Sequence, residues 1–544
     1  MIDTAHPCKV APELTVPEFL ESNPYYVEPD TVVYVDSDTG DEITWQQYID
    51  FSKRLATGLR RSSLQAPAGS RIMILSPNQP HYPMVYIGVM GAGLVPAPAS
   101  PAATASEVAA MMKLVKPFAV IVHPSCRETA TAAVKLLPES LKPRGFIGMT
   151  PDSTEEYGSI FSLVDSVRDR EILPFVGLQG RKGKDTLALV PFSSGTTGAF
   201  KGVMLSHTNI ISNVLQLRQG WADYWEAKPR SLSFLADYHS YSHTQICIVN
   251  PVSGMLTVRM PKFHFENFLQ AIERYKVQAL PIVPPVAVQL AKNPLTAKYD
   301  LSSINRIMIA AAPTKPEICE ILACKYKSPI LQSFGCTEVS PTSIVLPAHM
   351  SHHQGSVGKL LPGMQCRLVD PITEELVDFN KEGEFQYKGP NVMMGYYGNP
   401  QATREAFTAD GWLRSGDVGY RNKDMLYWCT DRIKELIKVR GFQVSPAELE
   451  GILLSHEKVI DAAVNRGIAE DTELPVAFVI VKPEHRNEAV KREIHAHVNK
   501  SVTYYKQLAG GIIWVDDIPK NPSGKILRRL LPVLQLSKAP KYKL

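Results

Sequence analysis

The sequence predicts an α/β fold that contains a parallel, doubly wound sheet, followed by a β-rich part and a smaller α+β part. Short apolar runs at 71–75 (RIMIL), 119–123 (AVIVH) and 306–310 (RIMIA) alternate with helix-length segments such as 267–275 (NFLQAIERY). Buried strands separated by helices are typical of parallel sheets. The chain has 544 residues and 44% apolar residues, which is enough for several hydrophobic cores.

Further runs extend the same alternation. We expect strands at 186–192, 256–260 and 279–283, and a helix at 208–217. The apolar stretch 84–99 is shorter than the roughly 18 residues of a membrane span and ends in prolines. It therefore predicts a buried helix and strand.

The pattern changes after about residue 350. The segments 365–370, 383–389 and 424–429 are short, alternating and bounded by glycine turns, which indicates a small antiparallel barrel or sheet.

After residue 430 the chain predicts a small α+β domain. Residues 445–454 form a helix start, with Ser445 as N-cap and Glu448 as its capping-box partner. A strand (477–481) and an amphipathic helix (488–498) follow, and the helix places Val490, Ile494 and Val498 on one face.

Composition excludes several classes of protein. The net charge of +4 is small and mixed along the chain, so neither nucleic acid nor a membrane surface is an expected partner. The eight cysteines contain no CxxC pair and indicate free thiols in a reducing compartment. Residues 1–14 lack the pattern of a secretory signal. His352 and His353 have no metal-ligand spacing around them, and we expect them to be solvated.

Residues 191–202 (PFSSGTTGAFKG) follow the apolar run LALV. A strand that runs into a Gly/Ser/Thr loop offers N–H groups and hydroxyls to an anion, and Lys201 adds charge. The loop is not a Walker A motif, because Gly202 follows Lys201. The segment alone is also compatible with a surface turn.

Five segments in order resemble the adenylate-forming superfamily of acyl-CoA synthetases, adenylation domains and luciferases. They are SSGTTGAFKGVMLSH (193–207), QSFGCTE (332–338), GWLRSGD (411–417), DRIKELIKVRGFQVSPAELE (431–450) and IPKNPSGKILRRLL (518–531). In GWLRSGD, Ser415 replaces the family's threonine. Segment 280–294 is particularly similar to the 4-coumarate–CoA ligase-like branch.

The resemblance implies an N-terminal AMP-binding domain (1–430) with two doubly wound subdomains and a small β-barrel, a hinge (431–436) and a small mobile α+β domain (437–544). The implied activity is that of an ATP-dependent acyl- or aryl-CoA ligase. It converts a carboxylic acid to acyl-AMP with release of pyrophosphate and transfers the acyl group to coenzyme A. The implied cofactors and substrates are ATP, Mg²⁺ and coenzyme A, and we expect a monomer or homodimer.

The resemblance also implies the ATP site. The phosphates would lie against the loop, Thr337 would contact phosphate, and Glu338 would bind Mg²⁺. Phe334, where relatives commonly carry tyrosine, would stack on adenine, and Asp417 and Arg432 would contact the ribose. The full implied set is Ser193, Ser194, Gly195, Thr196, Thr197, Gly198, Lys201, Ser333, Phe334, Gly335, Thr337, Asp417 and Arg432, with Glu338 as metal ligand.

Lys525 is the implied catalytic cation, because in the family this lysine bridges the carboxylate and the α-phosphate. Removing one such pre-aimed cation typically costs about 10²–10³ in rate. Lys434 is the implied hinge about which the terminal domain turns before the thiol attacks. The implied coenzyme A contacts are Lys262, Arg440, Gly441 and Phe442, and glycine at 441 permits close approach of a ligand to the backbone.

The acid site is implied to lie beside His239, which borders the carboxylate. The implied contacts of the acyl-adenylate are Tyr241, Gln245, Ala311, Gln332, Lys438 and Gln443. Asp237 departs from the family's common Pro-Leu-Phe-His, and we expect a surface acid there in preference to a buried charge that recognises an amine. Ser240 and Ser333 also depart from the pattern, so aryl, fatty and polyketide-type acids all stay open.

Three alternatives remain at the level of sequence. An adenylation enzyme that loads a carrier protein in trans shares the first half-reaction, a luciferase-like oxygenase shares the motifs, and a non-catalytic relative is disfavoured by intact Lys525, Glu338 and Asp417. We expect a cytoplasmic protein. A peroxisomal location stays open, because the terminal Tyr-Lys-Leu matches two of the three positions of an SKL-type signal.

Overall fold

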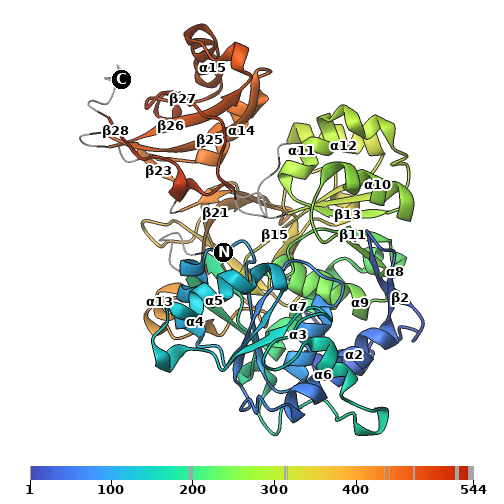
Figure 1. Ribbon diagram of the computed structural model, residues 1–544. Helices are drawn as coiled ribbons and strands as arrows, with labels where there is room; N and C mark the ends of the chain where they lie inside the picture. Colours follow the sequence, from blue (N-terminus) through green and yellow to red (C-terminus); the bar gives the residue numbers. More distant parts are fainter. Residues whose placement is uncertain are drawn as a thin grey trace.

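The computed structural model (Figure 1) describes residues 2–194, 200–310, 314, 316–353, 355–433, 435–439, 442–469, 472–520 and 526–536. A long sheet runs in the order β17-β16-β15-β14-β13-β11-β12-β2-β3. The strands from β15 to β2 are parallel, and antiparallel strands extend both edges. Their bounds are β2 (Val32–Asp36), β3 (Glu42–Thr44), β11 (Ser231–Ser233), β12 (Thr257–Arg259), β13 (Ala279–Ile282), β14 (Arg306–Ile309), β15 (Ile330–Gly335), β16 (Thr342–Val345) and β17 (Lys359–Leu360).

A second parallel sheet runs in the order β5-β4-β6-β7. It comprises β4 (Arg71–Leu75), β5 (Val95–Ala99), β6 (Ala119–Val122) and β7 (Phe146–Gly148). The predicted strands at 71–75, 119–123, 256–260, 279–283 and 306–310 are confirmed, and 84–99 forms α3 (Tyr82–Gly91) followed by β5.

Helices cover both parallel sheets and form layers. α10 (Phe265–Tyr275), α11 (Pro284–Lys292) and α12 (Pro316–Tyr326) share a core with one face of the long sheet, and they lie together above β13 in Figure 1. α4 (Ala105–Val115) and α5 (Arg127–Lys135) pack on the outer face of the second sheet. Between the sheets lies a shared core that contains α1 (Val16–Glu21), α2 (Trp45–Arg61), α3, α6 (Ile160–Asp165), α7 (His207–Gly220) and α8 (Ala222–Ala227).

The β-rich part is an antiparallel sheet in the order β1-β18-β19-β21-β22, one of the two arrangements that the sequence left open. Its strands are β1 (Ile2–Thr4), β18 (Gln365–Val369), β19 (Gly383–Lys388), β21 (Leu413–Arg421) and β22 (Tyr427–Arg432). A smaller sheet joins β8 (Leu187–Leu189), β9 (Phe192–Ser194), β10 (Phe200–Ser206) and β20 (Gly395–Tyr396), and α13 (Pro400–Ala406) follows β20. This small sheet carries the residues on either side of segment 195–199.

The last part of the chain lies above β21 in Figure 1. Its sheet runs β27-β26-β25-β28, and the hairpin β23-β24 precedes it. The elements are β23 (Ile437–Val439), β24 (Phe442–Val444), α14 (Pro446–Ser455), β25 (Val459–Ile468), β26 (Glu473–Val481), α15 (Glu488–Ser501), β27 (Ile512–Trp514) and β28 (Leu534–Gln535). Val490, Ile494 and Val498 of α15 are buried, as the pattern predicted.

The capping box predicted at the start of α14 is only half formed. The Ser445 hydroxyl accepts a hydrogen bond from the Glu448 N–H at 3.2 Å, as expected for an N-cap. The Glu448 carboxylate, however, accepts from Lys506 Nζ at 2.7 and 2.8 Å. An ammonium partner therefore replaces the backbone N–H that the sequence pattern assigned to this carboxylate.

Candidate functional site

Glu338 is the centre of the predicted phosphate and metal site, and it lies in a short turn directly after β15. Its Oε1 accepts two hydrogen bonds, one from Ser193 Oγ at 3.2 Å and one from the Tyr396 hydroxyl at 3.0 Å. Its backbone carbonyl accepts from the Met393 N–H at 2.9 Å. Segments that are 145 and 58 residues away in sequence therefore meet at one carboxylate.

Lys201 lies on β10, the strand that pairs with the β20 strand of Tyr396. Its Nζ is 4.4 Å from the centre of the Tyr396 ring, a cation–π contact. Burial and the neighbouring Glu338 carboxylate hold the pKa of Tyr396 far above its ordinary value, so the phenol stays a hydrogen-bond donor. Burial, with Glu338 and Asp417 nearby, likewise raises the pKa of the Cys336 thiol. The region thus gathers hydroxyl donors, one ammonium group and carboxylates.

Asp417 and Arg432 are cross-strand partners on β21 and β22. Arg432 Nε donates to Asp417 Oδ1 at 2.8 Å, and Asp417 is almost fully buried. The Asp417 charge is the main reason that the pKa of Arg432 is raised further above its ordinary value. Gly416 precedes this pair with φ of +71°, a conformation that favours glycine, and the Ser415 hydroxyl accepts from the Asp417 N–H at 3.0 Å.

The segment that carries His239 contacts the Glu338 turn. The Thr337 hydroxyl donates to Ser240 Oγ at 3.3 Å. The Tyr241 N–H donates to His239 Nδ1 at 3.4 Å, so a neutral His239 carries its proton on Nε2. The structure therefore brings Ser240 against Thr337 in the turn after β15, and His239 directly precedes Ser240 in the chain.

Tyr241, Gln245 and Gln332 are all buried. Gln245 lies in a π-helical segment, Ser242–Val249 (η5), and Gln332 lies on β15. Such π-helical turns occur frequently at functional sites. Phe334, at the end of β15, packs edge-on against Phe385 at 5.7 Å between ring centres. Ser333 and Gly335 flank it on the same strand.

The expectation that Asp237 is a surface acid is wrong. Asp237 is 0% exposed and forms an ion pair with Arg259, which is 3% exposed. Arg259 compensates the Asp237 charge inside the protein. The alternative of a buried carboxylate that recognises an amine substrate is therefore not supported either. Local patterning missed this pairing because the partner lies 22 residues further along the chain, at the end of another strand.

The predicted coenzyme A contacts lie on separate elements. Lys262 follows β12, whereas Phe442 opens β24 and stacks on Tyr505 with ring centres 4.3 Å apart. The Phe442 side chain is 44% exposed, and the exposed Lys438 sits opposite Gln443 in the β23-β24 hairpin. Some predicted residues fall outside the described residues: Gly195, Thr196, Thr197, Gly198, Ala311, Lys434, Arg440, Gly441 and Lys525, together with the side chains of Ser194 and Gln443.

The residues around Glu338 fit a magnesium ion that is shared with a phosphate ligand. Among the described residues, no group of three His, Cys, Asp or Glu side chains could hold a metal ion. Mg²⁺ is commonly bound by one or two carboxylates plus substrate phosphates, and not by an all-protein cage. A single carboxylate beside the hydroxyl donors of Ser193 and Tyr396 matches that chemistry. His352 and His353 instead pack against each other in a tilted arrangement, with ring centres 4.1 Å apart.

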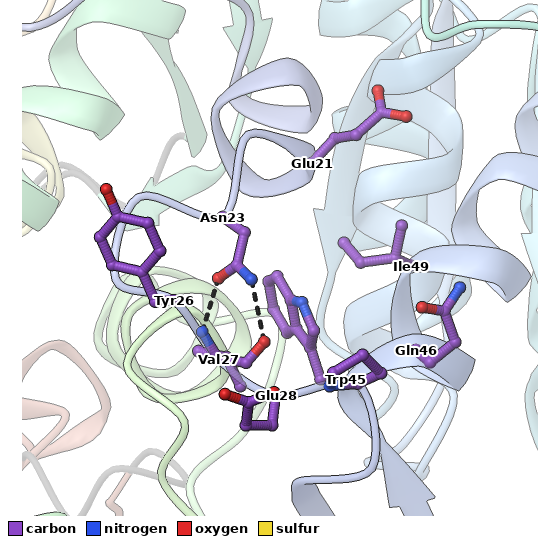
Figure 2. A pocket seen from close by; sticks show the side chains of 9 residues that line it. Glu21, Asn23, Tyr26, Val27, Glu28, Trp45, Gln46 and Ile49 are labelled. Atoms are coloured by element: carbon purple, nitrogen blue, oxygen red, sulfur yellow. Dashed lines mark hydrogen bonds between the residues drawn. The ribbon is translucent and has the colours of Figure 1, made fainter.

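A hollow of about 350 Å³ lies away from this site, where the turn after α1 meets the start of α2 (Figure 2). Asn23 closes the turn by two hydrogen bonds with the Val27 backbone, at 2.8 and 2.9 Å, and Trp45 forms one wall. None of its lining residues belongs to the predicted site. The chemistry of Glu338 and Asp417 identifies the functional region better than the size of this hollow.

Sequence reasoning missed Tyr396. It lies in MMGYYGNP, after the β-rich part begins, and no motif named above contains it. The structure reveals its role through the pairing of β20 with β10. This pairing places Tyr396 opposite Val203 and close to Lys201.

A strand-end site that combines the Glu338 carboxylate, hydroxyl donors and the Lys201 ammonium group has the chemistry of a phosphate-binding site. The family model for AMP-binding enzymes matches residues 24–397, and the model for the AMP-binding enzyme C-terminal domain matches 448–525. The chain belongs to the AMP-binding enzyme family.

Two relatives and one solved structure illustrate the likeness. Probable 4-coumarate–CoA ligase 1 of Dictyostelium discoideum is 34% identical, over 97% of this chain and 96% of the relative. 4-Coumarate–CoA ligase 1 of Petroselinum crispum is 32% identical, over 95% and 94%. A crystal structure of ATP-bound MatB from Rhodopseudomonas palustris is 24% identical and has the same fold, with a TM-score of 0.83 over 95% of this chain and 98% of that chain.

Within the described ranges, none of the helices is long and apolar enough to cross a membrane. All eight cysteines lie in the described residues and are free thiols.

Proposed function

We propose that this chain is an ATP-dependent acyl- or aryl-CoA ligase that activates a carboxylic acid as acyl-AMP and passes the acyl group to coenzyme A. The observation that carries the proposal is that the Ser193 and Tyr396 hydroxyls both donate hydrogen bonds to the Glu338 carboxylate. Family membership and two coumarate–CoA ligase relatives support the same activity.

The chain's own residues would act as follows. The loop after β9 binds the departing phosphates with N–H and hydroxyl donors, and Lys201 adds positive charge at its far end. Glu338 would hold Mg²⁺, which neutralises phosphate charge when it is bound. Asp417 accepts hydrogen bonds from the ribose hydroxyls while Arg432 fixes its orientation at 2.8 Å. His239 borders the acid's carboxylate, while its Nδ1 accepts from the Tyr241 N–H.

Lys525 supplies the mobile cation of the first half-reaction, and Lys434 is the proposed hinge between residues 1–430 and 437–544. Joining a carboxylate to the α-phosphate crowds negative charge, which one positioned ammonium group stabilises. Lys262, Arg440, Gly441 and Phe442 are the proposed coenzyme A contacts in the second half-reaction. We further propose a cytoplasmic enzyme, for which the eight free cysteines are support.

The test is acid-dependent pyrophosphate release from ATP across a panel of aryl, fatty and polyketide-type acids, with and without coenzyme A. We expect AMP and acyl-CoA to accumulate only when coenzyme A is present. Lys525→Ala should slow pyrophosphate release by about 10²–10³. The matched control is Lys458→Ala, because Lys458 pairs with Glu493 at 2.6 Å and is not a site residue. A K525A enzyme that releases pyrophosphate at the parent rate contradicts the proposal. Formation of acyl-AMP without any acyl-CoA would indicate that a carrier protein, and not coenzyme A, is the acceptor.

A further inference from the structure

Asp237 and Arg259 form a buried ion pair whose position is not explained by stability. Asp237 Oδ2 accepts from Arg259 Nη2, and Asp237 Oδ1 accepts from Ser242 Oγ at 2.8 Å and lies 3.7 Å from Cys247 Sγ. Removing two charges from water costs several kcal/mol, and replacing a buried pair by apolar residues is often neutral or stabilising. A buried ion pair is therefore weak evidence for a purely stabilising role.

The backbone of Asp237 is held as firmly as its side chain. Its N–H donates to Asn78 Oδ1 at 2.9 Å, and its carbonyl accepts from the Tyr86 hydroxyl at 2.8 Å. Asn78 also donates to the carbonyls of Phe234 and Leu235, at 3.3 and 2.9 Å. Asp237 is therefore the point at which the segment after β11 is fixed to three other elements: the turn after β4, helix α3 and the end of β12.

This fixed point lies just before the residues that face the site. His239 follows two positions later, and Ser240, one further, meets the Thr337 hydroxyl at 3.3 Å. Thr337 is adjacent to Glu338, whose carboxylate contacts Ser193 at 3.2 Å. Between Asp237 and the π-helical η5 the chain has few residues in which to absorb a displacement. A shift of Asp237 therefore moves His239 and Ser240 relative to Thr337.

We propose that Asp237 and Arg259 are positioning residues that hold the His239–Ser240 segment against the Thr337–Glu338 turn, and so set the carboxylate end of the acid site. The inference rests on the proposed function. In this chain a charged anchor fixes the segment in place of apolar packing alone.

The test compares Asp237→Asn, which leaves Arg259 unpaired, with the double variant Asp237→Leu/Arg259→Met, which removes both charges. Asp3→Asn is the matched control, because Asp3 forms an equally buried pair with Arg421 at 2.6 Å in the antiparallel sheet. For each protein we would measure thermal unfolding, the kcat and KM of pyrophosphate release for acid and for ATP, and hydrogen exchange of the peptide 234–250.

We expect both Asp237 variants to lower the kcat of the folded enzyme by about tenfold to a hundredfold, as misplacement of a reacting group does. The KM for ATP should stay within about twofold, and amide exchange should rise in 234–250. D3N should lower the unfolding temperature and leave kcat unchanged.

A double variant with parent kcat and parent exchange in 234–250 overturns the inference, as does a D237N loss that follows only the unfolded fraction. A parent enzyme that releases no pyrophosphate with any acid overturns the proposed function first, so the two failures are distinguishable.

Discussion

Tyr396 shows how a residue outside every motif can define a site. β20 pairs with β10, and this places the Tyr396 hydroxyl 3.0 Å from Glu338 Oε1 and its ring beneath Lys201. The raised pKa of Tyr396 keeps it a donor at every physiological pH. It therefore orients the carboxylate that would hold Mg²⁺, much as outer partners orient metal ligands in general.

Tyr396→Phe should weaken the Mg²⁺ dependence of pyrophosphate release. A hydrogen bond to a charged group contributes about 1.5–3 kcal/mol, so we expect the Mg²⁺ concentration for half-maximal rate to rise by about tenfold to a hundredfold. Titration of Mg²⁺ at saturating ATP measures this shift. Tyr397→Phe is the control, because the Tyr397 ring packs against Arg71 and not against Lys201. The Arg71 Cζ atom is 5.4 Å from the centre of this ring. Equal Mg²⁺ curves for Y396F and the parent would show that the hydroxyl does not orient Glu338.

Candidate site residues could be named from the sequence where a short motif resembles the family's, as for Ser193, Glu338, Asp417 and Arg432. Their convergence is a finding of the structure, and their roles stay predictions. Tyr396 and Asp237 were not predictable, because what defines each is a partner on another strand. Tertiary pairing of this kind leaves no periodic signal in the local sequence.

At the scale of elements, the alternation of apolar runs predicted β4, β6, β12, β13 and β14, because fully buried parallel strands read as continuous apolar segments. The same reasoning could not find β1, which pairs with β18 more than 360 residues away, at Ile2 and Arg367. The buried Asp3, which Tyr427 and Arg421 both contact, shows why the chain start joins this sheet. The π-helical η5 was also invisible, because its residues are buried on all sides.

The start of α7 contains a pH-sensitive contact. The Val16 N–H, at the start of α1, donates to His207 Nδ1 at 3.0 Å, and burial, with Arg181 nearby, lowers the pKa of His207 to about 3. Burial also lowers the pKa of His81 to about 4 and that of His243 to about 3. The folded protein keeps these rings neutral. The unfolded chain takes up their protons near pH 6.5.

Stability should therefore fall as the pH drops below about 6.5 towards 4, because the unfolded state binds more protons in that window. Each such histidine contributes a loss of about 1.4 kcal/mol per pH unit. Urea unfolding at pH 7.5 and pH 5.5 measures the loss. His207→Asn keeps an acceptor for the Val16 N–H without a titrating ring, so its two midpoints should lie closer together than the parent's. A variant with the parent's pH dependence would assign the loss to other groups.

At the scale of the whole molecule, polar contacts join the β-rich sheet to the last part of the chain. Asp431 on β22 accepts from the Ser445 hydroxyl and from the Ala447 N–H (3.2 Å) at the start of α14. Burial raises the pKa of the Asp431 carboxyl. Arg528, in the terminal motif, pairs with Glu435 and, at 2.7 Å, with Glu450. These contacts flank position 434 on both sides, so they bear on the proposed turning of residues 437–544.

If residues 437–544 turn about position 434 as proposed, the Asp431 contact belongs to one of two arrangements, and its loss should change the balance of the half-reactions. A helix N-cap contact contributes about 0.5–2 kcal/mol, so Asp431→Ala should slow the half-reaction that uses this arrangement by about twofold to thirtyfold and leave the other unchanged. Single-turnover measurement of acyl-AMP formation, and separately of acyl-CoA formation from isolated acyl-AMP, resolves the two. Asn487→Ala is the matched control, because it removes the N-cap of α15, which accepts from the Val490 N–H at 3.0 Å within the same part of the chain. N487A should lower stability without altering either half-reaction. Equal slowing of both half-reactions by D431A would mean that Asp431 acts through its neighbour Arg432 at the nucleotide, and not through the placement of α14.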